Sequence, residues 1–208
     1  DLGVDADVFV PDIPDAGSTR DQLSIPRDVR LLLYVGRLAP EKNVRTLIEA
    51  FSLLHRRSPG QHHLLCVGDG TQRASITDLQ KETDCIHWMP YCTDPQELAS
   101  LYRAADLFVH PGVQETFGLV ALESQASGTP VVGIKGSYMD RIIFTDQKPW
   151  ATTNSPVALA DAIERNFMSD LRASGLRASK EARQRYSWNT VFMRMMSFYS
   201  DVVLSYEP

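Results

Sequence analysis

The sequence has 208 residues, enough for one domain or slightly more, and 43% of them are hydrophobic, enough to bury a full core. Its formal net charge of −5 argues against nucleic acid as the main partner, because the phosphate backbone attracts a basic surface. No apolar run reaches the ~18 residues that a membrane-spanning helix needs.

Cysteine usage points to a reducing compartment. The three cysteines, Cys66, Cys85 and Cys92, are an odd number, and they form no CxxC pair and no cluster with histidine. This pattern predicts buried thiols, with neither a disulfide framework nor a zinc site. We therefore expect a cytoplasmic protein.

The first residues, DLGVDADVFVPDIP (1–14), have linker character. They include Pro11 and Pro14 and contain no methionine. We expect the chain to be a fragment that begins at a domain boundary.

Strands and helices alternate through residues 30–134. The predicted strands are 30–36, 63–68, 85–91, 106–112 and 129–134, and the predicted helices are 43–57, 71–83, 94–105, 117–128, 155–168, 171–186 and 188–204. Asp94, Ser155 and Ser187 are the expected helix caps. This alternation predicts an α/β fold, a Rossmann-like doubly wound parallel sheet. Ligands of such sheets bind beyond the carboxyl ends of the strands, here after Val35, Val67 and His110.

Two cations follow the first predicted strand, in GRLAPEKN (36–43). Gly36 allows a backbone turn, and Arg37 and Lys42 flank the start of the next helix. Two cations beside a helix N-terminus favour an anion site. Two solvated surface charges explain the same residues equally well, so the stretch by itself leaves both interpretations open.

A second glycine-rich stretch is VGDGTQR (67–73). It has neither the GxGxxG spacing of a dinucleotide site nor the GK[ST] of a phosphate-binding loop. By itself it predicts a tight turn between strand and helix, with Gly68 in the turn, in preference to a ligand contact. Arg73 either faces a ligand or pairs with a nearby acidic residue.

Two glutamates, Glu115 and Glu123, enclose seven residues in QETFGLVALE (114–123). If the residues from 117 onward are helical, the rise of 1.5 Å per residue separates the two glutamates by roughly 12 Å along the axis. Catalytic carboxylate pairs of glycosidases lie only ~5 to 9.5 Å apart. We therefore expect this pair to hold the two ends of one elongated ligand. For Glu123, an exposed helix position is the alternative.

Backbone amides at the predicted helix N-terminus lie between the two glutamates. Those of Phe117, Gly118 and Leu119 are expected to be free to donate to phosphate, and Gly118 allows close approach. Together with the two cations, they suit a diphosphate flanked by hydroxyl-bearing groups, as in a nucleotide sugar.

These stretches resemble a known family, the C-terminal donor-binding domain of retaining glycosyltransferases with the GT-B fold, family 4 (group 1). The resemblance covers nearly all of residues 1–200 in the family's order. The matching stretches are GVDADVFVP (3–11), VGRLAPEKN (35–43), VGDGTQR (67–73), LYRAADLFVHPG (101–112) and ETFGLVALESQASGTPVV (115–132). Residues 115–123 fit the E-x7-E signature of retaining enzymes.

The resemblance implies transfer of a sugar from a nucleoside diphosphate sugar, with retention and without a metal or other cofactor. Arg37 and Lys42 would neutralise the diphosphate, Glu115 would bond the sugar hydroxyls, and these three form the implied catalytic set. Glu123 would bond the ribose, and residues 86–89 with Arg73 would line the base. The implied donor-binding residues are Gly36, Arg37, Lys42, Gly68, Arg73, Ile86, Glu115, Thr116, Phe117, Gly118, Leu119 and Glu123.

One stretch departs from the family pattern. In KGSYMDRI (135–142), Ser137 stands where the family usually has a second glycine, and Asp140 stands where glutamate is usual. We expect Asp140 to cap or pair locally. The base (UDP, GDP or ADP), the sugar and the acceptor stay open.

The resemblance also implies a division of the chain. Residues 1–28 would be an interdomain linker, 29–187 the nucleotide-sugar-binding domain, and 188–208 a helix that packs on a missing N-terminal acceptor domain. The fragment would then be inactive in transfer, with Met195, Phe198 and Val202 exposed. The full-length enzyme could attach peripherally to the inner face of a membrane. A sugar-nucleotide epimerase or hydrolase of the same fold and a degenerate binding-only module are the alternatives.

Overall fold

The computed structural model describes residues 2–11, 16–144 and 150–204. Five parallel strands form one sheet in the order β3-β2-β1-β4-β5. Their bounds are β1 Arg30–Val35, β2 His62–Val67, β3 Ile86–Met89, β4 Leu107–His110 and β5 Val131–Gly133. The chain runs outward from β1 to β3 and then returns to the other side of β1 with β4, so the strand order reverses between β1 and β4.

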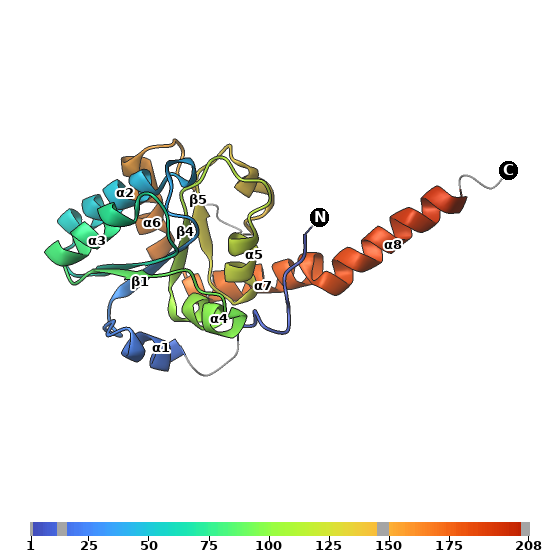
Figure 1. The fold of residues 1–208 in the computed structure, drawn as a ribbon, viewed down its shortest axis with the longest axis horizontal. Coiled ribbons are helices and arrows are strands. Elements are labelled where there is room, and N and C mark those ends of the chain that lie inside the picture. Colours follow the sequence, from blue (N-terminus) through green and yellow to red (C-terminus); the bar gives the residue numbers. More distant parts are fainter. Residues whose placement is uncertain (1, 12–15, 145–149, 205–208) are drawn as a thin grey trace.

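Helices cover both faces of the sheet, as Figure 1 shows. One face carries α2 (Val44–Arg57), α3 (Arg73–Glu82) and α6 (Pro156–Phe167). The other carries α4 (Pro95–Ala104), α5 (Leu119–Ala126) and α7 (Leu171–Tyr186), with α1 (Ala16–Gln22) packed on α4. Two 3-10 helices, η1 (Pro40–Lys42) and η2 (Tyr138–Arg141), lie in loops. The last helix is α8 (Trp188–Leu204).

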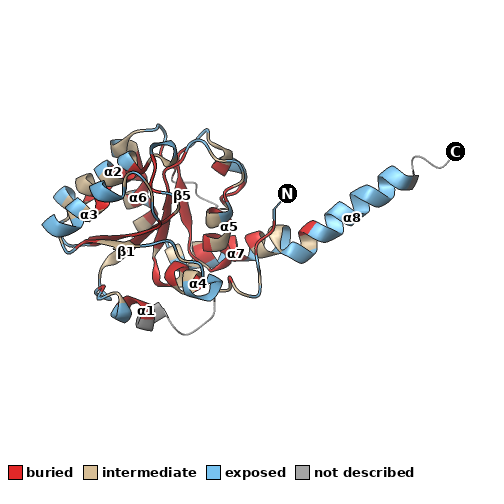
Figure 2. Cartoon of the chain, viewed as in Figure 1, coloured by how far each residue is buried: buried red, intermediate tan, exposed pale blue. Residues whose placement is uncertain are grey.

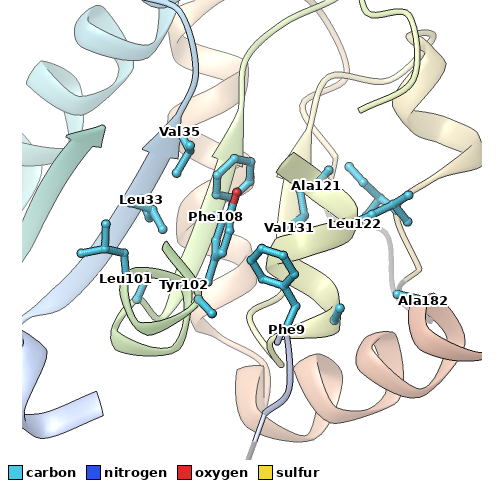
Figure 3. Close-up of a cluster of buried hydrophobic side chains, with 14 of the residues drawn as sticks. Phe9, Leu33, Val35, Leu101, Tyr102, Phe108, Ala121, Leu122, Val131 and Ala182 are labelled. Carbon is cyan, nitrogen blue, oxygen red and sulfur yellow. The ribbon is translucent and has the colours of Figure 1, made fainter. Parts of the chain in front are cut away.

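The strand sequences are apolar because both faces of the sheet are buried. In β1, Leu31 and Leu33 enter the core under α4 and α5, whereas Leu32 and Tyr34 enter the core under α2 and α6. Figure 3 shows the first of these cores, in which the ring of Phe108 lies among side chains from several elements.

The structure confirms the predicted doubly wound fold and every predicted strand and helix. Asp94, Ser155 and Ser187 accept hydrogen bonds from backbone amides of the first helical turn at 2.9, 3.2 and 3.3 Å, as their capping roles require. Helix α5 begins at Leu119, two residues later than expected, because Gly118 takes a left-handed conformation with φ of 82°.

Helix α1 lies inside the segment predicted as a linker, of which residues 1 and 12–15 are outside the described part. Arg20 anchors it: its guanidinium donates to the carbonyls of Ala104 at 2.8 Å and Val29 at 3.1 Å and pairs with Asp106 at 2.9 Å. No local sequence pattern indicates this contact, because its partners lie as far as 86 residues away.

Helix α8 leaves the body of the molecule and is exposed along most of its length (Figures 1 and 2). Met195, Phe198 and Val202 are 43%, 66% and 38% exposed, as the sequence predicted. Within the described residues, no helix combines the length and apolar character needed to cross a bilayer.

Helix α7 packs unusually closely on the turn between α5 and β5. A Cβ placed on Gly175 would lie 1.9 Å from the carbonyl oxygen of Gly128, and the hydroxyl of Ser179 donates to the carbonyl of Ala126 at 2.7 Å. Gly175 is therefore required by packing, although glycine costs about 1 kcal/mol relative to alanine inside a helix.

Substituting Gly175→Ala should destabilise the protein by about 1 to 3 kcal/mol, because the steric conflict outweighs the gain in helix propensity. Urea denaturation followed by circular dichroism measures this change. Ser174→Ala, next to it on the same helix, is the control and should stay within about 0.5 kcal/mol of the parent. A stabilised Gly175→Ala variant would contradict the packing argument.

Candidate functional site

A pocket of about 270 Å³ opens where the strand order reverses, at the carboxyl ends of β1 and β4. Doubly wound sheets bind ligands at this place, because the helices that follow the two strands diverge there. Its lining includes the predicted residues Gly36, Arg37, Lys42, Glu115, Thr116, Phe117, Gly118 and Leu119. The structure thus brings these eight together from two separate loops.

The pocket walls are joined by an ion pair between Lys42, in η1, and Glu115, in the loop after β4. The Lys42 Nζ atom lies 2.9 Å from Glu115 Oε2 and 3.1 Å from Oε1. His110 Nε2 lies 3.4 Å from the same Oε2. Hydrogen bonds from His110 and then Lys42 outweigh burial and lower the pKa of Glu115 to about 2. Glu115 is therefore an ionised acceptor near neutral pH and cannot supply a proton there.

The second cation of the pocket, Arg37, is much more exposed. Its guanidinium pairs with Glu41 at 3.2 Å, and the two side chains are 66% and 46% exposed. Such an exposed pair contributes little to stability, so it opens at low cost. An entering anion would compete with one carboxylate at Arg37 and with another at Lys42.

Gly68 shapes the site without lining the pocket. A Cβ on Gly68 would lie 2.1 Å from the carbonyl oxygen of Gly36, and Gly68 has a φ of 140°. The amide of Gly36 donates to Val67 at 3.0 Å, so the loops after β1 and β2 stay in close backbone contact. These contacts agree with the preferred interpretation of VGDGTQR as a tight turn.

Arg73 and Ile86 lie away from the pocket. Arg73 pairs with Asp69 at 3.2 Å and stacks over the ring of Trp88 at 5.5 Å, which fits the second of its two predicted alternatives. Ile86 is the first residue of β3 and is only 4% exposed, inside the core under α2 and α6. The carboxyl end of that strand is Met89.

The N-terminus of α5 forms one side of the pocket. Gly118 occupies the N-cap position of α5 and provides no side-chain cap. The first backbone amides of α5 are therefore available to a ligand. The φ of 82° at Gly118 favours glycine, and a Cβ there would also lie 2.1 Å from the end of the Met139 side chain. Nearby, the carboxylate of Asp140 accepts from the amide of Gly136 at 3.1 and 3.2 Å, the local capping role expected for it.

Glu123 lies farther along α5 and does not line the pocket. Its side chain is partly buried and accepts a hydrogen bond from the Tyr102 hydroxyl at 3.0 Å. Burial raises the pKa of Glu123, and the bond from Tyr102 opposes the rise only in part. The alternative of a simply exposed helix position for Glu123 is therefore wrong.

His110 is a pocket residue to which the sequence patterns assigned no role beyond marking a strand end. It is the last residue of β4, its side chain is only 5% exposed, and it lines the pocket. A polar residue at the carboxyl end of a buried strand was the available signal. In the described part of the chain, no three His, Cys, Asp or Glu side chains gather as a metal site would require.

Comparisons with known proteins give a consistent picture. A sequence model described as glycosyl transferases group 1 matches residues 15–185. The D-inositol 3-phosphate glycosyltransferase of Saccharomonospora viridis is 32% identical over 225 aligned residues, which cover 98% of this chain and 50% of that protein. The chain thus spans about half the length of the curated relatives it matches.

Solved structures show the same architecture. Sucrose-phosphate synthase from Thermosynechococcus elongatus superimposes with a TM-score of 0.81 at 28% identity, covering 98% of this chain and 52% of that one. Anabaena Alr3699/HepE, solved with UDP and glucose, has a TM-score of 0.79 at 23% identity, with coverage of 95% and 55%. At 23% identity, the likeness to HepE shows the fold alone.

The low pKa of Glu115 predicts an acid-sensitive contribution to stability. Because the folded pKa of about 2 lies below the ordinary 4.5, the contribution is fully present above about pH 4.5 and is lost as pH falls toward 2. It amounts to about 3 kcal/mol at most.

Urea denaturation from pH 7 to pH 2.5, which spans the window of the Glu115 titration, compares the parent with Glu115→Gln. The parent should lose stability more steeply on the acid side than the variant. Glu41→Gln, which removes an exposed carboxylate from the same loop region, is the control and should follow the parent. Parallel curves for the parent and Glu115→Gln would contradict the argument.

Proposed function

The chain belongs to the glycosyl transferases group 1 family, and from this premise we propose that its pocket binds the donor of a glycosyl transfer reaction, a nucleoside diphosphate sugar. The observation that carries the proposal is the combination at the pocket. Two cations, an ionised carboxylate and an uncapped helix N-terminus face one cavity at the strand-order reversal. HepE, of the same fold, was solved with UDP and glucose.

The diphosphate would lie between the two cations and the start of α5. Arg37 exchanges Glu41 for a phosphate oxygen at low cost, and Lys42 turns from Glu115 toward the phosphates. Positive charge placed at the leaving diphosphate stabilises the transition state, in which negative charge develops there. The amides of residues 117–119 add hydrogen-bond donors beside the helix N-terminus.

The sugar and the ribose would meet the two glutamates. Glu115 is held ionised, so it accepts hydrogen bonds from sugar hydroxyls. Glu123 lies outside the pocket lining, farther along α5, and its carboxylate, which already accepts from Tyr102, would accept from the ribose hydroxyls. The base would lie over the loops after β2 and β3, near Arg73 on Trp88, because Ile86 is enclosed in the core.

The E-x7-E pattern of residues 115–123 supports a finer assignment of the stereochemistry and the family. We place the enzyme among the retaining members of family 4, with transfer through an oxocarbenium-like state. Arg37 and Lys42 would supply the positive charge at the diphosphate, so the assignment calls for no metal ion. The free thiols of Cys66, Cys85 and Cys92 suit a cytoplasmic setting.

The acceptor would bind on a second domain. Matched relatives are about twice as long as this chain, and the exposed apolar side chains of α8 offer a surface for that domain. They include Phe192, Met196, Phe198 and Tyr199, which are 51%, 58%, 66% and 58% exposed. In this proposal residues 29–187 bind the donor, residues 1–28 connect the two domains, and residues 188–208 pack back on the N-terminal domain. Peripheral membrane contact would then belong to the second domain.

Donor binding is tested by titration calorimetry of the 208-residue chain with UDP-glucose, GDP-mannose and ADP-glucose. We expect saturable binding of at least one of them. Lys42→Ala should weaken that binding at least tenfold, since it removes a cation from the diphosphate. Arg45→Ala removes an exposed cation that pairs with Glu49 on α2 and is the control. A folded sample that binds none of the three would overturn the proposal.

Turnover is tested in the full-length enzyme. Lys42→Ala should lower kcat by about a hundredfold, the size expected when one group that stabilises the leaving charge is lost. Arg45→Ala should leave kcat unchanged. An unchanged kcat for Lys42→Ala would remove Lys42 from the mechanism, and donor hydrolysis independent of any acceptor would favour a hydrolase instead.

A further inference from the structure

His110 contacts the carboxylate of Glu115 from the floor of the pocket. It ends β4, and its ring is almost completely enclosed. A Cβ on Gly112 would lie 3.2 Å from His110 Cε1, so the chain turns closely over the ring. Packing therefore fixes the position of the imidazole more firmly than that of a flexible surface side chain.

The ring has one partner and one buried nitrogen without any. Nε2 lies 3.4 Å from Glu115 Oε2, whereas Nδ1 is buried and has no hydrogen-bond partner among the described residues. A neutral imidazole carries its proton on one nitrogen only. With the proton on Nδ1, a buried donor would lack an acceptor, and the bare Nε2 would face a carboxylate. The surroundings therefore select the tautomer with the proton on Nε2.

The donors around Glu115 already fill its acceptor sites. Oε1 receives Lys42 at 3.1 Å and the Thr116 amide at 3.3 Å, and Oε2 receives Lys42 at 2.9 Å and faces His110. A carboxylate offers about two acceptor sites on each oxygen. Sugar hydroxyls can therefore bond Glu115 well only when Lys42 gives up its two positions.

We propose that His110 is a positioning residue that holds Glu115 in place when Lys42 turns to the diphosphate. One donor then remains on each carboxylate oxygen, the Thr116 amide on Oε1 and His110 on Oε2. Each oxygen has one acceptor site left for a hydroxyl. The inference rests on the proposed donor function, and it couples the two ends of the site: diphosphate binding opens Glu115, and His110 keeps it aimed at the sugar.

Two substitutions separate hydrogen bonding from packing. His110→Phe keeps an aromatic ring but removes the donor, whereas His110→Gln keeps an N–H group near the position of Nε2. Circular dichroism melting establishes that each variant is folded. The probes are the tightest-binding nucleotide sugar of the three above and its nucleoside diphosphate, titrated into the 208-residue chain.

His110→Phe should weaken binding of the nucleotide sugar about tenfold. It should change binding of the nucleoside diphosphate less than twofold, because only the sugar reaches Glu115. His110→Gln should stay within about threefold of the parent for both probes. If His110→Phe weakens binding of both probes equally, or weakens binding of neither, the positioning role is overturned. A loss in His110→Gln as large as that in His110→Phe would overturn it too.

Nuclear magnetic resonance of the side-chain nitrogens tests the contact without any nucleotide and without a His110 substitution. The parent should show the tautomer protonated on Nε2, and Glu115→Ala should shift that nitrogen or broaden its proton by exchange. A proton on Nδ1 would overturn the inference, and so would His110 nitrogen signals that do not change in Glu115→Ala. A parent chain that binds no nucleotide sugar contradicts the donor function instead, and the spectrum still decides whether His110 holds Glu115.

Discussion

The ion pair between Lys42 and Glu115 connects the two halves of the sheet at their point of divergence. Lys42 follows β1, and Glu115 follows β4, the strands between which the order reverses. The helices after these strands leave toward opposite faces, so the crevice between their loops is open unless side chains bridge it. A contact of 2.9 Å between atoms 73 residues apart in sequence therefore sets the shape of the pocket.

The two glutamates of one motif differ because their surroundings differ. Glu115 lies beside a cation and a histidine, which lower its pKa, whereas Glu123 lies half-buried beside a tyrosine hydroxyl, and burial raises its pKa. Charge and hydrogen bonding prevail at the first position and desolvation at the second. Glu115 is consequently suited to accept hydrogen bonds from a neutral hydroxyl, and general acid catalysis by it is disfavoured.

Close backbone contact brings the loops to the pocket. Gly68 lets the loop after β2 approach the backbone of Gly36 within a distance that a side chain would forbid, and Gly118 takes the left-handed conformation from which α5 begins. The first amides of α5 then face the cavity from backbone positions, beside the more exposed side chain of Arg37. The glycines in these motifs thus set the backbone path of the loops, and the polar groups beside them line the pocket.

The sequence by itself determined the five strands, helices α2 to α8 and most of the pocket, because these depend on local patterns. Apolar runs, helical spacing and the residues after strand ends located Gly36, Lys42, Glu115 and the start of α5 without coordinates. The tertiary structure alone decided which charges meet. It paired Lys42 with Glu115, enclosed Ile86 in the core, tied Arg20 to Asp106 and placed His110 under the carboxylate. Those outcomes depend on burial and on contacts between residues far apart in the chain. Neither can be predicted from a local periodic pattern in the sequence.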